Sequence, residues 1–104
     1  MHEFNNYNII NLKINNKIYK LWVADTEEKK RIGLSQVSKL KPLTGMIFVY
    51  TKPVRHSFTM KNTKIPLTMI FLDNKGNVVY QKKCKPYQKE KVRPKSDFYY
   101  VIEI

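Results

Sequence analysis

The sequence contains very little cysteine, glycine and tryptophan. Cys84 is the single cysteine, so no disulfide can form within the chain. No apolar run approaches the roughly 18 residues that a membrane-spanning helix needs. The start of the chain, MHEFNNYNII, lacks the basic residues and long apolar run of a secretory signal, so we expect no signal peptide. These absences exclude a disulfide-bonded scaffold and are consistent with a reducing compartment.

Acidic residues are also scarce. Asp and Glu total 8 against 20 Lys and Arg, which gives a net charge of +12. A charge of this size favours polyanions such as nucleic acid or an acidic protein. Only three of the basic residues are Arg, the residue best suited to reading bases and clamping phosphates. The nine Asn residues point to a general bias toward Lys, Asn and Ile, so a purely compositional origin of the charge stays open.

Side chains that bind metals are few. The imidazole and thiol ligands are His2, His56 and Cys84, and none of them has a paired metal-site spacing. His56 falls on the apolar face of an alternating run, so we expect a core histidine rather than a catalytic base. Lys83 and Lys85 flank Cys84 and should lower the pKa of its thiol, making it reactive without making it catalytic. We therefore predict no catalytic residue, no metal site and no cofactor.

Short alternating runs of apolar and polar residues predict strands. The first two, over 8–14 and 18–23, flank Asn15 and Asn16, which tolerate left-handed turn geometry, and so predict a hairpin. Further strands are expected over 46–50, 54–61, 67–72, 78–82 and 98–104. In the last of these, alternation places Phe98, Tyr100, Ile102 and Ile104 on one face.

One segment has the features of a helix. Asp25 and Glu28 stand three residues apart, as in a capping box, and basic residues follow the acidic start. The apolar face is thin up to Gly33, which predicts a short helix lying on a sheet. We therefore expect a single domain over residues 1–104, frayed over 1–7. Its predicted fold is α+β and β-rich, a small barrel-like curled sheet of about six to seven strands with one short helix.

A polar segment, residues 61–64, interrupts two apolar strand-like runs. It offers an ammonium, an amide and a hydroxyl, a set that suits a carboxylate, a phosphate or a peptide backbone. The alternative is that Asn62 and Thr63 bond to their own backbone and hold a turn. With two residues just upstream, the candidate ligand- or partner-binding residues are Lys61, Asn62, Thr63, His56 and Arg55.

A second polar segment, 82–95 (KKCKPYQKEKVRPK), predicts a long exposed loop. It has one acid, Glu90, and one aromatic residue, Tyr87. Proteins that bind single strands interleave several aromatics with charge, so a solvated loop is the alternative to a polyanion site. The candidate polyanion-binding residues are Lys82, Lys83, Lys85, Lys89, Lys91, Arg93 and Lys95.

Five segments follow one another in a pattern known from a protein family. They are ADTEE (24–28) with GL (33–34), GMIFV (45–49), FTMKNT (58–63) with IPL (65–67), DNKGNVV (73–79) and YVIE (100–103). This order of segments resembles domain of unknown function 192 (DUF192), a family of bacteria, archaea and phages. The resemblance covers about four fifths of the chain. It implies a compact, β-barrel-like α+β fold and no known reaction, substrate or cofactor.

Two positions depart from the pattern that the resemblance implies. Family members commonly carry Trp where this chain has Thr59, and many carry Asp where it has Thr68. If that Trp and Asp serve one common family site, this protein has lost part of the site.

Three functional hypotheses follow. The first is a non-catalytic binding or accessory module of a bacterium or phage, such as a virion or assembly component, located in the cytoplasm or on a virion. The second is a nucleic-acid-binding accessory protein that uses the basic 82–95 loop. The third is an enzyme acting on a small anionic or peptide-like substrate at residues 61–63. A cleft that joins His56, Lys61 and Asn62 would favour the enzyme, and a flat, positive face would favour nucleic acid.

Overall fold

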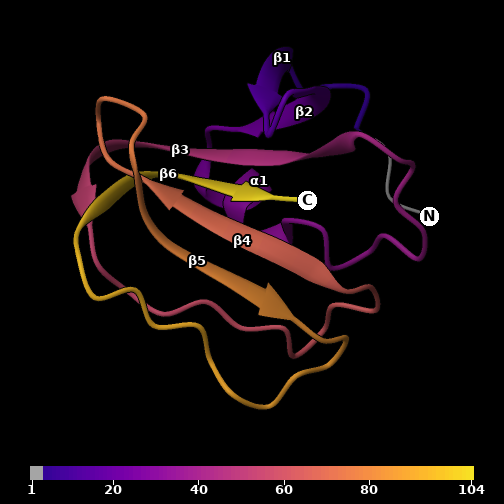
Figure 1. Ribbon diagram of the computed structural model, residues 1–104. Coiled ribbons are helices and arrows are strands. Elements are labelled where there is room, and N and C mark those ends of the chain that lie inside the picture. Colours follow the sequence, from indigo (N-terminus) through magenta and orange to yellow (C-terminus); the bar gives the residue numbers. More distant parts are fainter. Residues whose placement is uncertain (1–3) are drawn as a thin grey trace.

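The computed structural model describes residues 4–104 and places six strands and one helix among them (Figure 1). The elements are β1 (Ile9–Ile14), β2 (Lys17–Ala24), α1 (Glu27–Ile32), β3 (Thr44–Val54), β4 (Leu67–Leu72), β5 (Val78–Cys84) and β6 (Phe98–Glu103). All six strands form one sheet in the order β1-β2-β3-β6-β4-β5. β2 and β3 run parallel, and the other neighbouring pairs are antiparallel. No helix among residues 4–104 is long and apolar enough to cross a membrane.

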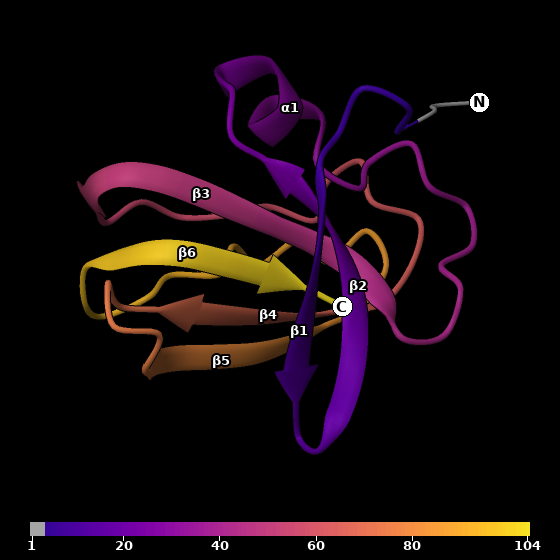
Figure 2. The ribbon, with the colours of Figure 1, turned by 90° about the horizontal axis from the view of Figure 1, so that it is seen from above.

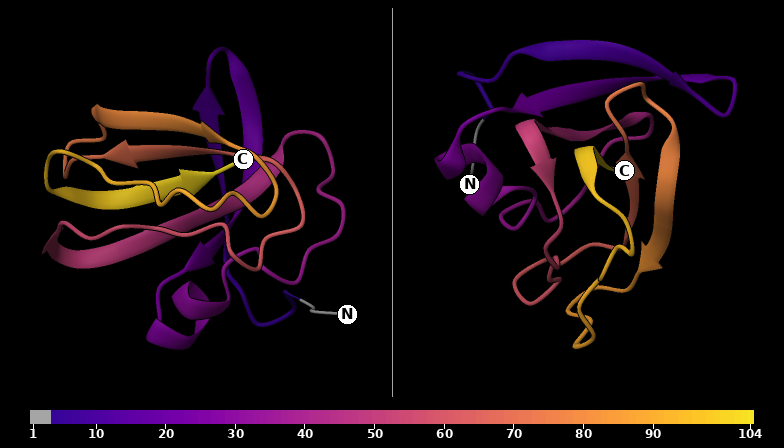
Figure 3. Two further views of the ribbon diagram at one scale, coloured as in Figure 1. Left: turned by 90° about the horizontal axis from the view of Figure 1, so that it is seen from below. Right: turned by 90° about the vertical axis from the view of Figure 1, so that its left-hand side faces the viewer.

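The sheet is curled but open. β1 and β5 are its two edges, so the strands do not close into a barrel. The β1–β2 hairpin crosses the direction of the other four strands at a steep angle (Figures 2 and 3). The prediction of a β-rich fold with one short helix is therefore confirmed, whereas the barrel-like closure is wrong.

The expected separate strand over 54–61 is absent from the described residues. β3 instead continues through Pro53 to Val54, and the chain then runs without regular structure, apart from an isolated bridge between Phe58 and Val92. Pro53 is tolerated because β2 pairs with β3 only as far as Phe48, so the missing amide proton of Pro53 breaks no β2 bond. The register between β3 and β6 also shifts between Val49 and Val54.

The predicted N-terminal hairpin is confirmed. Ile14 of β1 lies opposite Lys17 of β2, which leaves Asn15 and Asn16 as a two-residue turn. Both have positive φ angles, 51° and 66°. Two left-handed residues are what a tight hairpin turn needs, and Asn tolerates that conformation better than most side chains.

The sheet has an apolar core on each face. The core beneath α1, called the helix-side core, comprises Tyr7, Ala24, Leu34, Met46, Phe48, Met60, Ile65, Leu67, Met69, Phe71, Cys84, Val92, Phe98 and Val101. The opposite, hairpin-side core comprises Leu21, Ile47, Ile70, Leu72 and Ile102, covered by side chains such as Leu12 and Tyr19 of the hairpin. Phe98 belongs to the helix-side core while Tyr100, Ile102 and Ile104 belong to the other side, so the four do not share a face as predicted.

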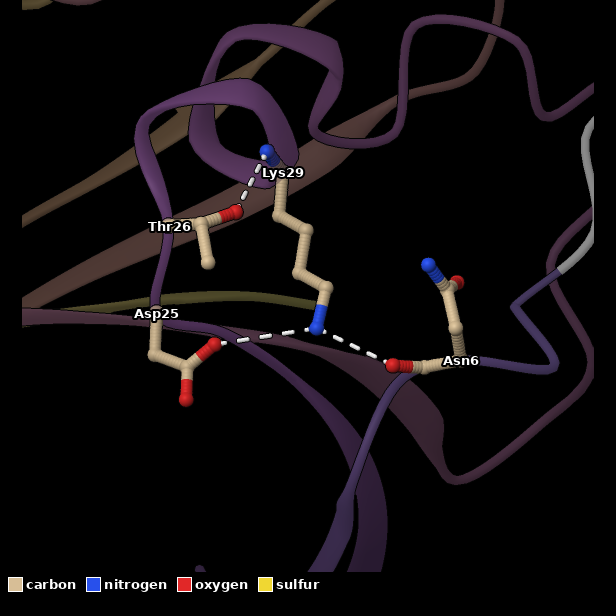
Figure 4. A network of polar contacts seen from close by, with 4 residues as sticks. All are labelled: Asn6, Asp25, Thr26 and Lys29. Carbon is tan, nitrogen blue, oxygen red and sulfur yellow. Dashed lines mark hydrogen bonds and ion pairs between the residues drawn. The ribbon is translucent and has the colours of Figure 1, made fainter.

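Helix α1 begins one residue later than the predicted capping box. Thr26, not Asp25, is the N-cap, and its hydroxyl accepts a hydrogen bond from the backbone N–H of Lys29 at 3.2 Å. The Lys29 side chain then reaches out of the helix (Figure 4). Its Nζ lies 3.7 Å from Asp25 Oδ1 and donates to the backbone oxygen of Asn6 at 3.0 Å. This cation therefore joins α1 to the N-terminal segment.

The N-terminal segment is packed where the structure describes it. The ring of Phe4 stacks on Trp22 with centroids 4.2 Å apart, and Tyr7 is buried in the helix-side core. Lys29 Nζ lies 4.8 Å from the centroid of the Tyr7 ring. The prediction of a frayed end is thus wrong for residues 4–7, because aromatic burial holds them, and residues 1–3 lie outside the described part of the chain.

Candidate ligand-binding cleft

A cleft of about 680 Å³ opens between α1 and the segment that follows β3. Residues 27–28 and 30–35 form one wall, and residues 56–59 with Asn62 and Thr63 form the other. Phe48 and Tyr50 of β3 and Glu103 of β6 complete the lining. Clefts of this size that combine apolar surface with a few polar groups are typical small-molecule sites.

Glu103 is the most unusual residue of the cleft. Its side chain lies on the helix-side face, because it stands directly opposite Met46 and Met69 on the two neighbouring strands. The residue is only 5 % exposed. No hydrogen bond or ion pair connects its carboxyl to another residue among 4–104, and burial is the single cause that raises its pKa to about 7.

Glu103 is among the residues that line the cleft. Among the described residues, no fully enclosed side-chain oxygen or nitrogen lacks a hydrogen-bond partner. The unpaired Glu103 oxygens are therefore not fully enclosed, and solvent or a ligand in the cleft that Glu103 lines can reach them. A carboxyl whose pKa lies near neutrality in a cleft is a typical functional group.

Gly45 sets how closely β3 approaches the end of β6. A Cβ added at Gly45 would clash with the backbone oxygen of Glu103 and with the Ile104 side chain. Any larger residue would push β6 away from β3 and move the Glu103 carboxyl with it. The close approach of the two strands therefore explains why the 45–49 motif begins with a glycine.

An ammonium group already lies on an aromatic ring in this cleft. The Nζ atom of Lys30 lies 4.0 Å from the centroid of the Tyr50 ring, within the range of a cation–π contact. Burial, assisted by the charges of Glu27 and Glu103, raises the pKa of Tyr50 to about 12, so the phenol stays protonated at neutral pH.

His56 lies at the cleft and not in the core, so the prediction of a core histidine is wrong. It is exposed, because the chain leaves the sheet after Val54 and no longer alternates between two faces. Its ring stacks on Phe58 with centroids 5.0 Å apart and meets Tyr50 edge-on at 5.9 Å. Its Nδ1 lies 3.2 Å from the backbone oxygen of Ser57.

The other residues predicted for this site divide into two groups. Asn62 and Thr63 line the cleft, whereas Lys61 and Arg55 are exposed and do not. Arg55 instead pairs with Asp97, with Nε 3.1 Å from Oδ1. The structure therefore brings His56, Asn62 and Thr63 together and leaves the two cations outside.

The turn at 61–64 is held mainly by backbone groups. The Thr63 amide donates to the Met60 oxygen at 3.0 Å, and the Lys61 amide donates to the Thr59 hydroxyl at 3.0 Å. The Thr63 oxygen accepts from the Tyr87 amide at 3.0 Å. Neither the Asn62 amide nor the Thr63 hydroxyl makes these bonds, so the two side chains are not what holds the turn.

The 82–95 segment is less loop-like than predicted. β5 extends to Cys84, and Val92 is buried and exchanges two backbone hydrogen bonds with Phe58, at 2.9 and 2.8 Å. All seven candidate polyanion-binding side chains, Lys82, Lys83, Lys85, Lys89, Lys91, Arg93 and Lys95, are exposed. Tyr87 is 57 % exposed beside them. The segment is thus continuous with β5 at its start and held to Phe58, outside the sheet, at Val92.

Cys84 is a buried thiol, and its pKa is raised rather than lowered. It is buried in the helix-side core, where burial and the charge of Glu103 raise the pKa of its thiol, outweighing the opposite effect of Lys82. The prediction of a reactive thiol is therefore wrong, because burial of the thiol outweighs the influence of the nearby lysines, of which Lys83 and Lys85 are exposed. No three His, Cys, Asp or Glu side chains within residues 4–104 gather as a metal site, and His2 lies outside that range.

Family comparison supports the resemblance noted in the sequence. The DUF192 family, described as "Uncharacterized ACR, COG1430", matches residues 10–104. The chain belongs to the DUF192 family. No curated protein matches the chain significantly.

Two solved structures share the fold of this DUF192 chain. A protein of unknown function from Novosphingobium aromaticivorans DSM 12444 is 25% identical, with a TM-score of 0.84 over 99% of this chain and 77% of that chain. A protein from Sinorhizobium meliloti 1021, named as a candidate transcription regulator, is 22% identical, with a TM-score of 0.78 over 94% of this chain and 81% of that chain. At this identity the second likeness shows the fold alone.

The two departures from the family pattern do not share a site. Thr59 lines the cleft. Thr68 lies between Leu67 and Met69, both of the helix-side core, so alternation places it on the opposite face of β4. A residue at position 68 therefore contributes nothing to the cleft, and only Thr59 changes the lining.

Sequence reasoning missed Glu103, the central group of the cleft. Glu103 is an acid inside an otherwise apolar closing strand, at a position that alternates with Ile102 and Ile104. Alternation places Glu103 on the same face of the strand as Val101, which is buried. An acidic residue on an apolar face was the signal that could have indicated a functional carboxyl. The contribution of α1 to the lining had no comparable signal, since it depends on how the helix packs.

Proposed function

We propose that this protein is a non-catalytic binding module whose cleft between α1 and residues 56–63 holds a small molecule. The observation that carries the proposal is Glu103, a buried residue of the cleft lining whose carboxyl has no hydrogen-bond or ion-pair partner among residues 4–104. Burial of an unpaired polar group destabilises a fold, and an occupant of the cleft that pairs with the carboxyl would offset this cost. A bacterial or phage accessory role, in the cytoplasm or on a virion, stays a prediction.

The composition of the walls supports the same proposal. Aromatic rings of Tyr50, His56 and Phe58 supply apolar surface, and Asn62 and Thr63 supply hydrogen-bonding groups. Ligand sites combine these two kinds of surface, because apolar contact gives affinity and a few polar groups fix orientation.

A fragment screen followed by amide NMR tests the proposal. Compounds that bind should shift the resonances of residues 27–35, 56–63 and 103. Ser57→Trp places an indole in the cleft and should abolish these shifts, whereas Ser38→Trp, at an exposed position outside the lining, should leave them intact. Shifts that survive Ser57→Trp, or that cluster on the hairpin side, would contradict the proposal. Recovery of chemically altered compounds would instead favour an enzyme at the same cleft.

A second candidate function is polyanion binding by the 82–95 segment. One observation favours it: its seven cationic side chains are all exposed, and none of them is in an ion pair with the described residues. Uncompensated cations on one segment attract phosphates through counterion release. The salt dependence of nucleic-acid binding by variants that lack lysines of this segment tests this function.

A further inference from the structure

We propose that the cleft takes a small organic ammonium ion, whose charged nitrogen contacts the Glu103 carboxyl. This inference rests on the proposed binding function and names the chemical class of its ligand. The Glu103 carboxyl, the aromatic walls and the charge of the lining all support it.

The missing partner of Glu103 is a cation or a strong donor. The protein has 20 Lys and Arg residues, yet among residues 4–104 none pairs with this carboxyl. Buried carboxylates are normally paired, because ionisation away from water carries a large desolvation cost. A ligand ammonium would supply both the opposite charge and the hydrogen bonds that residues 4–104 do not provide.

The aromatic walls suit the same ligand class. Lys30 Nζ lies 4.0 Å from the Tyr50 ring centroid, so one ring of the lining already binds an ammonium by its face. Phe58 and His56, stacked 5.0 Å apart, present further ring surface at the opposite wall. A carboxyl combined with several aromatic faces is the usual environment of bound ammonium groups.

The charge of the lining also favours a cation. Three of the 8 acidic residues line the cleft, against two of the 20 Lys and Arg. The lining therefore carries a formal charge of −1 (three acids against two cations), in a protein that carries +12 overall. Glu27 and Glu28 are exposed on α1 and are screened by water, so Glu103 makes the dominant contribution.

Binding of an ammonium ion should depend on pH. A cation stabilises the ionised carboxyl, so below pH 7 the ligand has to displace a proton from Glu103 and binds more weakly. The titratable and charged groups that line the cleft together with Glu103 are Glu27, Glu28, Lys30, Arg31, Tyr50 and His56, and Cys84 is a further group that its charge reaches. Histidine is the other residue type that changes charge in this interval, so His56→Asn separates its effect.

The test titrates the protein with benzylammonium, benzyl alcohol and benzoate, which share a ring and differ in charge. Benzylammonium should bind at least 10-fold more tightly than the other two at pH 8, and its affinity should fall 10-fold or more by pH 5.5. Glu103→Gln should weaken it by 10-fold or more at pH 8 and remove most of the pH dependence. Glu90→Gln, an equally conservative change at an exposed position outside the cleft, should change the affinity less than twofold.

Several outcomes overturn the assignment. One is that benzyl alcohol or benzoate binds as tightly as benzylammonium. Another is that Glu103→Gln binds benzylammonium with an affinity within twofold of the wild type. A third is that benzylammonium does not bind in the cleft. A pH dependence that persists in Glu103→Gln and disappears in His56→Asn also overturns it. If other compounds still bind in the cleft, the proposed binding function stands without the ammonium. Should Glu103→Gln fail to fold, Glu103→Met, which matches its neighbours Met46 and Met69, replaces it.

Discussion

Glu103 of β6 stands directly opposite Met69 of β4, so a carboxyl and a thioether are cross-strand neighbours beneath the helix. The residue on its other side is Met46, also fully buried. Thioethers offer only weak hydrogen-bonding capacity, so the pair provides contact area without solvating a charge. This surrounding explains why the Glu103 carboxyl ionises at a higher pH than an exposed one.

Protein stability should fall as the pH rises through neutrality. Burial raises the pKa of Glu103 to about 7, above its usual value, so the folded state binds this proton more tightly than the unfolded state. The contribution is fully present below the unfolded pKa and is lost as the pH rises through about 7. Glu103→Gln cannot lose this proton. The free energy of unfolding of the variant should therefore rise by about 2–3 kcal/mol relative to that of the wild type between pH 5 and pH 8.5. Urea denaturation of both proteins at pH 5 and pH 8.5 measures these free energies. A difference between variant and wild type that is the same at both pH values would contradict the prediction.

Asn62→Ala should leave the free energy of unfolding within about 0.5 kcal/mol of the wild type. The Asn62 side chain is exposed, and the turn around it is held by backbone bonds such as that from Thr63 to Met60. Thermal denaturation provides the measurement. A loss of about 1–2 kcal/mol would show that the amide holds a buried hydrogen bond after all. The unfolding free energy of Asn62→Ala is compared with that of Thr63→Val, an isosteric change at the neighbouring buried position.

Lys29→Met should loosen the N-terminal segment from α1. The change removes the bond to the Asn6 oxygen, the contact with Asp25 and the cation over Tyr7, while keeping most of the apolar stem. We expect a loss of about 1 kcal/mol and faster proteolysis at residues 4–7. Arg31→Met, at an exposed position of the same helix, is the matched control. Equal losses in both variants would exclude a specific tether.

Cys84 should react slowly with thiol reagents in the native protein. The thiol is buried and its pKa is raised, so few molecules expose a thiolate. Reaction with a disulfide reagent in the native state and in urea gives the measurement, and the rate should increase by several orders of magnitude on unfolding. Rapid native labelling would restore the prediction of an activated cysteine.

If nucleic acid binds specifically to the 82–95 segment, the salt dependence of the affinity should depend mainly on the lysines of this segment. Neutralising Lys83, Lys85, Lys89 and Lys91 together should lower the slope of log affinity against log salt by about 0.7–0.9 per lost phosphate contact. Neutralising Lys13, Lys17 and Lys20 on the exposed hairpin should lower it less. Equal reductions per charge would mean that the basic surface is generic.

Much of the fold could be predicted from local patterns. The alternating runs of the hairpin, the Asn15-Asn16 turn and the apolar run over 67–72 are local signals, and the structure has the hairpin, the turn and strand β4 at these positions. The limits of β3 could not be predicted, because Pro53 looks like a strand breaker until the pairing partner is known. Closure of the sheet is equally non-local, since it depends on whether β1 and β5 meet.

The candidate site was only partly predictable. The polar segment after β3 pointed to His56, Asn62 and Thr63, which do line the cleft. Sequence spacing could not show that Lys61 and Arg55 point elsewhere, because that depends on the path of irregular chain. The role of Glu103 needed the β4–β6 register, which joins residues more than thirty positions apart in the sequence.

The open edges of the sheet give the basic residues of β5 a physical role that requires no partner. An unpaired edge strand exposes a row of backbone donors and acceptors, which another chain can join. β5 presents Lys82 and Lys83 at exposed positions along such an edge. Two molecules aligned edge to edge would bring these charges together, so the lysines oppose aggregation through β5. The β1 edge exposes Ile9 and Ile10 instead, which makes the hairpin the surface where self-association would begin.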